Sequence, residues 1–117
     1  MKNFILIFRM DLTTATAQPS QKHLDQYMVD WTNWIRTIDE KGLLADGGNH
    51  FSKTGYVLRK GVIEKSIYSS NSESIAGYIL IYSEKIEQAL DIASKCPILN
   101  GNGTSVEVRE LDSPGLA

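Results

Sequence analysis

The sequence predicts a single domain of the α+β class, and three observations carry that prediction. Residues 2–10 and 75–82 are short, β-rich segments with apolar side chains on both of their alternating faces, so each is expected to be a strand covered on two sides. Residues 20–41 change to an apolar period of three and four, which is typical of an amphipathic helix. Residues 104–111 alternate between apolar and polar and predict a half-exposed strand.

The first strand and the first helix have the clearest patterns. In residues 2–10, Phe4, Leu6 and Phe8 share one face, while Ile5 and Ile7 share the other. The helix that follows is expected to begin after an N-cap at Ser20 and to end at Gly42. Its apolar stripe consists of Leu24, Met28, Trp31, Ile35 and Ile38, widened on one flank by Tyr27 and Trp34.

The middle of the chain predicts shorter elements. Residues 43–45 form a short strand that runs into a turn at residues 46–48. Lys60-Gly61 is a two-residue hairpin connection between strands over residues 56–59 and 62–68.

The segment 75–97 organises the domain. Its strand leads into a helix over residues 84–96, for which Ser83 is the expected N-cap and Pro97 the stop. The apolar positions expected to be buried in this helix are Ile86, Ala89, Leu90 and Ala93. In the last strand, Val106 and Val108 are expected to point inward and Glu107 and Arg109 outward.

The element order predicts how these pieces assemble. Strand, helix, strand with a hairpin, strand, helix and strand is the split βαβ, ferredoxin-like arrangement with an extra β-hairpin. In that arrangement both helices cover one face of an antiparallel sheet, yet the two expected central strands are apolar on both faces. A second copy related by a two-fold axis is the simplest cover for the other face, so we expect a homodimer packed sheet to sheet.

Composition narrows the classes of partner. The chain has 117 residues, a net charge of −2 and one cysteine, Cys96, which excludes an internal disulfide and fits a reducing, cytoplasmic location. The sequence has no basic tract that would neutralise a phosphate backbone, so nucleic acid is not an expected partner, and no apolar run is long enough to span a membrane. We expect one domain over residues 1–112 and a flexible tail over residues 113–117.

Several segments resemble the YCII-related proteins, in particular their DGPF-domain branch. They are the first strand, Lys41-Gly42-Leu43-Leu44, Ala76-Gly77-Tyr78-Ile79-Leu80-Ile81, and the ending Ser105-Val106-Glu107-Val108-Arg109. The resemblance implies a dimeric α+β barrel, in which ferredoxin-like subunits join through their sheets. The Asp-Gly-Pro-Phe signature falls on Lys65-Ser66-Ile67-Tyr68, so a role carried by its aspartate is absent here. The family has largely no established reaction, and the resemblance therefore implies a fold and not a substrate.

Three residues are candidates for catalysis. Asp46 and His50 lie four apart in a glycine-bearing segment, where a carboxylate would orient an imidazole. An ordinary tight turn, which also uses Asp and Gly, is the competing interpretation. His23 near the start of the first helix is a candidate general acid or base because its pKa lies near neutrality, or else a partly exposed side chain without a role.

Four residues are candidates for ligand binding. Tyr68 and Tyr78 offer an apolar body with a hydroxyl, although core packing is the more frequent explanation for such residues. Arg9 at the end of the first strand would pair with an anionic ligand or with Asp11 on the surface. Trp34 belongs to the core or to the core and a pocket wall.

Two functions are weighed on this basis. The first is a small-molecule-binding protein, with a cleft between the first helix and the sheet, that is a cofactor-independent or lost enzyme. The second is a non-catalytic dimeric regulatory or interaction module. No cofactor is expected, and a metal enzyme is least favoured because two histidines and one cysteine supply few ligands.

Overall fold

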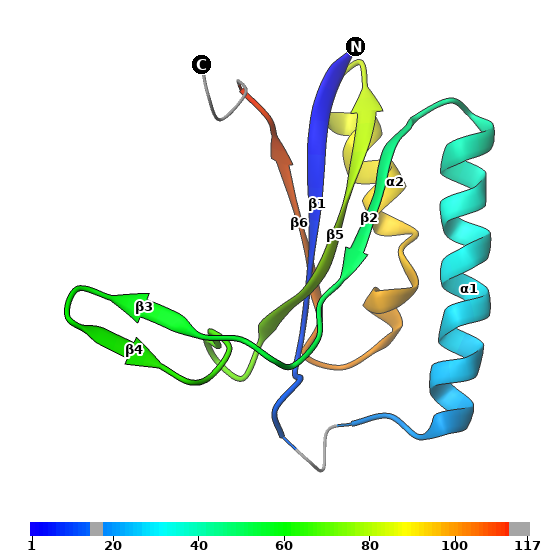
Figure 1. Cartoon of the computed structure of the whole chain (residues 1–117). Coiled ribbons are helices and arrows are strands. Elements are labelled where there is room, and N and C mark those ends of the chain that lie inside the picture. Colours follow the sequence, from blue (N-terminus) through cyan, green and yellow to red (C-terminus); the bar gives the residue numbers. More distant parts are fainter. Residues whose placement is uncertain (15–17, 113–117) are drawn as a thin grey trace.

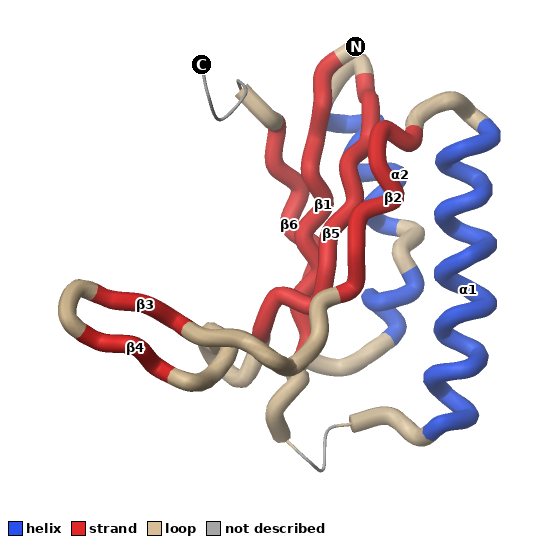
Figure 2. Tube along the Cα trace, viewed as in Figure 1, coloured by secondary structure: helices blue, strands red, loops and turns tan. Residues whose placement is uncertain are grey.

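The computed structural model describes residues 1–14 and 18–112, and the tail expected over residues 113–117 lies outside the described residues. The expected α+β class is confirmed. Four antiparallel strands form one sheet in the order β2-β5-β1-β6, and two helices pack on one side of it (Figures 1 and 2). A separate two-stranded hairpin projects from the other side as an arm, which gives the molecule extents of 43 × 40 × 19 Å.

The central strands have the predicted positions. β1 (Lys2–Met10) and β5 (Ser74–Ser83) pair along their whole length, and β6 (Ser105–Glu110) pairs with the other edge of β1. The burial of both central strands alternates, as a period of two requires: Phe4, Leu6, Phe8, Ile79 and Ile81 are buried, and the residues between them are partly exposed. One face of the sheet is therefore the floor of the core.

The first helix, α1 (Gln21–Glu40), is capped as expected. The Ser20 side chain accepts a hydrogen bond from the His23 N–H, and Gly42 takes a positive φ of 70° just beyond the C-cap. The expected apolar stripe is wrong in its first turns, because Leu24 and Met28 are exposed there. Only the turns that lie over the sheet bury their apolar residues, namely Trp31, Trp34 and Ile38.

The second helix, α2 (Ile86–Ser94), begins later than expected. Ser83 is the last residue of β5, and the N-cap is Lys85. The Gln88 side chain instead accepts hydrogen bonds from the Ser83 hydroxyl and the Glu84 N–H. The prediction that Ile86 and Leu90 are buried is also wrong, because both are exposed and Ala89, Ile92 and Ala93 face the core. A 3₁₀ turn, η2 (Pro97–Asn100), follows the helix.

The edge strand β2 (Leu44–His50) is longer than predicted. The glycines that suggested a turn lie inside the strand, where its pairing with β5 shifts on both sides of Asp46. Gly48 has a φ of 64°, and a Cβ there would lie 1.7 Å from the Tyr78 carbonyl oxygen, so only glycine permits this close approach.

The hairpin at Lys60-Gly61 is confirmed, with β3 (Val57–Arg59) and β4 (Val62–Glu64) on either side of it. β4 is shorter than the strand expected over residues 62–68. The arm carries large apolar side chains that its own fold leaves in solvent: Leu58 is 72% exposed and Ile63 is 70% exposed. An isolated hairpin of this length is marginally stable in water, so the arm's apolar surface is unusual for a free element.

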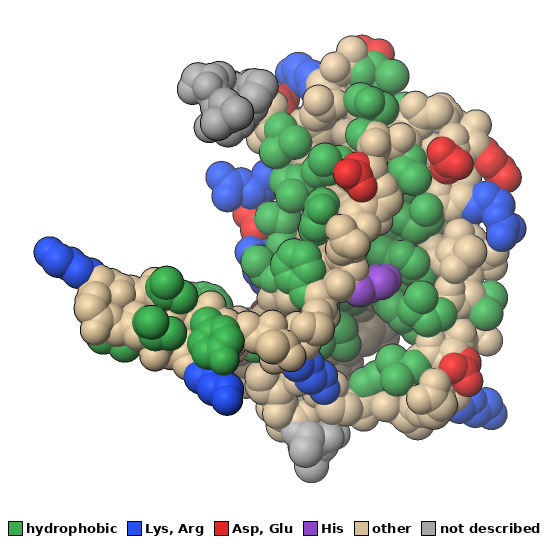
Figure 3. Space-filling view, viewed as in Figure 1, with side chains coloured by type: hydrophobic (Ala, Val, Ile, Leu, Met, Phe, Trp, Pro, Cys, Tyr) green, Lys and Arg blue, Asp and Glu red, His purple; other side chains and the backbone are tan. Residues whose placement is uncertain are grey.

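The two faces of the sheet are both apolar at their centre. The helix-covered face holds the core, and the opposite face, here called the open face, presents Ile5, Ile7, Tyr78 and Leu80 between the edge strands. Figure 3 shows hydrophobic side chains gathered over the sheet on the side from which the arm projects. Within the described residues, no helix or loop lies over the middle of this face (Figure 1).

Candidate functional site

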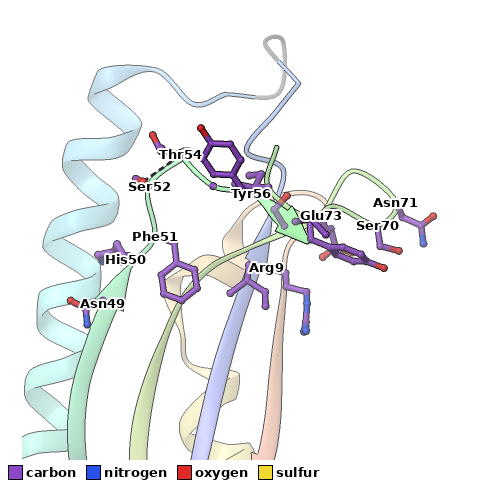
Figure 4. A pocket seen from close by; sticks show the side chains of 16 residues that line it. Arg9, Asn49, His50, Phe51, Ser52, Thr54, Tyr56, Ser70, Asn71 and Glu73 are labelled. Carbon is purple, nitrogen blue, oxygen red and sulfur yellow. Dashed lines mark hydrogen bonds between the residues drawn. The ribbon is translucent and has the colours of Figure 1, made fainter. Parts of the chain in front are cut away.

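A large cavity lies where the arm joins the sheet, at one end of the open face. It has a volume of about 1070 Å³ and opens broadly to solvent. Figure 4 shows side chains converging on it from the ends of β1 and β2, the chain that leads into the arm, and the loop before β5. The aromatic members are Phe51, Tyr56 and Tyr68, and the charged or titratable members are Arg9, His50 and Glu73.

Local backbone features bring these segments together. At the end of β2 the Phe51 N–H donates to the Ala76 carbonyl at 2.8 Å, which holds the chain against β5 before it turns into the arm. A register shift between Phe8 and Arg9 places Arg9 opposite Ile75. Arg9 and Ile75 therefore lie on the open face, beside the entrance of the arm.

An ion-pair network borders the cavity. Arg9 Nη1 donates to Glu107 Oε1 at 2.7 Å, and Arg109 Nε lies 3.8 Å from Glu107 Oε2. Glu73 Oε1 accepts from the Ser105 hydroxyl at 2.9 Å. One glutamate, Glu107, therefore serves two arginines at this edge of the sheet, and Glu73 adds a second carboxylate, so both signs of charge border the cavity.

Aromatic side chains form the apolar part of the lining. The Phe51 ring lies edge-on to the Tyr78 ring, with centroids 6.0 Å apart, which joins the cavity wall to the centre of the open face. The Tyr68 ring is 63% exposed and lies 6.0 Å from the Arg59 guanidinium of the arm. Together these rings offer a surface for an apolar or aromatic molecule.

The structure brings three of the sequence candidates together at this cavity: Arg9, His50 and Tyr68 all line it. The His50 ring also packs on the Trp31 ring, with centroids 5.1 Å apart, and so touches the end of the core. Tyr78 is next to the cavity through its contact with Phe51.

The remaining candidates lie elsewhere. Asp46 is exposed on β2, and its Oδ1 accepts from the Gly48 N–H at 2.7 Å. No hydrogen bond between Asp46 and His50 is found in residues 1–14 and 18–112. His23 is exposed at the start of α1. Trp34 is in the core, where its Nε1–H donates to the Ile92 carbonyl at 3.1 Å.

The space between the first helix and the sheet, where a cleft was expected, is filled by side chains. Phe8 meets Trp31 and Trp34 edge-on, with ring centroids 4.8 and 6.0 Å apart. Tyr27 packs on Trp31 from the exposed side, and burial raises the pKa of its hydroxyl. Burial also raises the pKa of the Cys96 thiol, to about 12, so the reactive thiolate is disfavoured.

Sequence reasoning missed Phe51, Tyr56 and Glu73. Phe51 and Glu73 belong to segments with no regular period, Tyr56 begins a short predicted strand, and the cavity joins stretches that are far apart in the chain. The polar loop before β5 carried one sequence signal, because Asn and Ser are common turn residues. In the structure Asn71 and Ser72 take positive φ angles there. Among the described residues, no three His, Cys, Asp or Glu side chains are grouped as a metal site requires.

No protein-family model matches the sequence, and no curated protein is significantly similar to it. In the described part of the chain, no helix is both long and apolar enough to cross a membrane.

Proposed function

We propose that this protein is a homodimer that binds a small organic molecule in the cavity at the root of the arm. The observation that carries the proposal is the position of that cavity, which shares Arg9, Phe51 and Ile75 with the edge of an uncovered apolar sheet face. A concave site with aromatic walls and a few polar groups is the usual form of a small-molecule site. A location in the reducing cytoplasm, suggested by the single buried cysteine, is part of the proposal.

The fold supports a ferredoxin-like subunit. The sheet order β2-β5-β1-β6, antiparallel pairing and two helices on one face agree with the split βαβ arrangement, and β3 and β4 are its extra hairpin. We propose on this basis, and on the resemblance described above, that the protein is related to the YCII family and forms a dimeric α+β barrel. The support is architectural and does not extend to a reaction.

The open face supports the dimer. Ile5, Ile7, Tyr78 and Leu80 form a continuous apolar surface across the two central strands, and such surfaces are rare on soluble monomers. The cavity, at about 1070 Å³, is slightly larger than the usual range for ligand sites of roughly 300–1,000 Å³. A second copy on the open face would narrow it.

The lining supports a ligand with an apolar body and one polar or anionic end. The body would stack among Phe51, Tyr56 and Tyr68, and the polar end would meet Arg9, whose side chain is only partly engaged by Glu107 and remains 31% exposed. Binding without turnover is favoured over catalysis, because Asp46 and His23 lie away from the cavity and, among the described residues, no carboxylate hydrogen-bonds to His50, which packs on Trp31.

A specific observation favours the second function, a dimeric interaction module without a small ligand. The exposed arm residues Leu58 and Ile63 lie outside the cavity and form an apolar surface suited to a protein partner. This alternative predicts no ligand response from the cavity.

The test combines solution mass with a thermal-shift screen against small metabolites. We expect a dimer at micromolar concentration and a hit that adds about 2.7 kcal/mol at a hundred times its dissociation constant, a rise in melting temperature of about ten degrees. Arg9→Gln should reduce the shift, whereas Arg36→Gln on α1, outside the cavity, should not. A screen without hits would favour the interaction module, and a monomer would contradict the dimer.

A further inference from the structure

One row of side chains crosses the open face and is charged only at its ends. Asp46 on β2 pairs with Leu80 on β5, Leu80 pairs with Ile5 on β1, and Ile5 pairs with Arg109 on β6. Directly paired residues of antiparallel strands point to the same face, so these four side chains share the open face. The row is therefore acidic at one edge, apolar in the middle and basic at the other edge.

The two end charges do not satisfy each other within one chain. Three strand spacings of about 4.8 Å separate their backbones by about 14 Å. Asp46 has one oxygen engaged by the Gly48 N–H, and among the described residues no lysine or arginine is in salt-bridge distance of it. Arg109 has a long contact of 3.8 Å with Glu107, whose closer partner is Arg9 at 2.7 Å.

We propose that the two copies pack with their two-fold axis parallel to the strands, so that Asp46 of each copy faces Arg109 of the other. This inference rests on the proposed dimer and specifies its register. Rotation about such an axis lays β2 of one copy over β6 of its partner and β5 over β1, so each row meets its own reversed image. Leu80 then meets the partner's Ile5, and both charged ends gain a partner of opposite sign.

Charge selects this axis over the perpendicular one. An axis across the strands lays each edge over the same edge of the partner, so Asp46 lies toward the Asp46 of the second copy and Arg109 toward its Arg109. Facing like charges disfavour an interface, and facing opposite charges set its register. Aligned sheets pack about 10 Å apart, a gap that a long arginine and a short aspartate can span together.

The same axis decides what closes the ligand cavity. Rotation about a line parallel to the strands keeps both arms at the same end of the dimer, where each cavity opens. The exposed side chains of Leu58 and Ile63 from one arm then lie against the partner's cavity and complete its apolar wall. A two-fold axis across the strands would instead put the two arms at opposite ends of the dimer and leave both cavities open.

Charge reversal tests the register. We expect Asp46→Arg and Arg109→Asp each to raise the dimer dissociation constant at least about tenfold, measured by analytical ultracentrifugation, because each change opposes like charges at two symmetric positions. The double variant D46R/R109D exchanges the two ends and should restore dimerisation toward the wild type. Glu40→Arg, an exposed acid-to-arginine reversal on α1, is the matched control and should leave the dissociation constant unchanged.

The outcomes separate the register from the dimer itself. A wild-type monomer would contradict the proposed dimer and mean that something else covers the open face. A wild-type dimer that is insensitive to both single reversals would contradict only the register. With the axis across the strands, Asp46 faces the same residue of the second copy, so its reversal replaces a repulsion between two acids by a repulsion between two bases. Should a reversal unfold the chain, the neutral Asp46→Asn and Arg109→Gln pair replaces it, and additive effects in their double variant, without coupling, would overturn the inference.

Discussion

The two faces of the sheet are built from the same two strands, yet only one of them is finished by the chain. On the covered face, Phe8 lies under Trp31 and Trp34 and is 2% exposed. On the open face, its neighbour Ile7 pairs with Tyr78, and the described residues provide no helix above them. Apolar content alone is therefore a poor guide to where a core lies, and the position of the helices decides which apolar face is internal.

The largest effect should come from removing an aromatic ring on the covered face, compared with the same kind of change on the open face. Phe8→Ala removes a fully packed ring from the core, and we expect the free energy of unfolding to fall by about 3–5 kcal/mol. Phe51→Ala, at the open face, removes a ring that is 47% exposed and should cost about 1 kcal/mol or less. Urea unfolding measures both. Equal losses would mean that the two faces are equally well packed in the isolated chain.

A charge introduced on the open face tests the other side of the comparison, namely whether a second copy covers that face. Ile7→Lys places an ammonium group in the middle of the open face, which a monomer tolerates and a sheet-to-sheet dimer does not. We expect the dimer dissociation constant to rise at least about a hundredfold, equivalent to about 2.7 kcal/mol, and sedimentation measures it.

Val29→Lys is the matched control for this change. Val29 is an equally apolar residue that is 55% exposed on α1, away from the open face. Its replacement should leave both the dissociation constant and the unfolding free energy nearly unchanged. A dimer that survives Ile7→Lys with wild-type affinity would show that this face is not the interface.

Local rules predicted the elements well because the signals are local. The Ser20 cap and the Gly42 stop are chemical requirements of one helix, and both strands of the sheet centre were recognised as short β-rich runs with apolar side chains on both faces. β2 was underestimated because its glycines are explained only by the approach of Tyr78, a residue about thirty positions away.

The candidate site could be predicted only in part for the same reason. Arg9, His50 and Tyr68 were recognised as polar or amphipathic residues at the ends of elements, and all three line the cavity. Phe51 and Tyr56 reach it from the chain that leads into the arm, and Glu73 reaches it from the loop before β5, and no periodic pattern specifies either approach. Asp46 and His50 seemed a pair because of their spacing, but the irregular strand pairing separates their surroundings.

The smallest effect concerns the thiol beneath the covered face. Burial raises the pKa of Cys96 from its ordinary value of 9.0 to about 12, so the folded protein holds a neutral thiol where the unfolded chain ionises. The unfolded state then binds fewer protons than the folded state above pH 9. The contribution of this thiol to the free energy of unfolding is therefore fully present below pH 9 and is lost as the pH rises toward 12. We expect the free energy of unfolding to fall by about 1 kcal/mol between pH 9 and pH 10 from this group.

Cys96→Ala isolates that contribution, because the variant keeps a small apolar residue at the site and has nothing to ionise there. Tyr27 acts in the same direction at higher pH, since burial raises its pKa too, and it is present in both proteins. The difference between the two stability curves therefore belongs to the thiol. Parallel curves from pH 8 to pH 10 would mean that the thiol reaches solvent, and that the covered face opens at this end more readily than its packing against Ile98 and the helices implies.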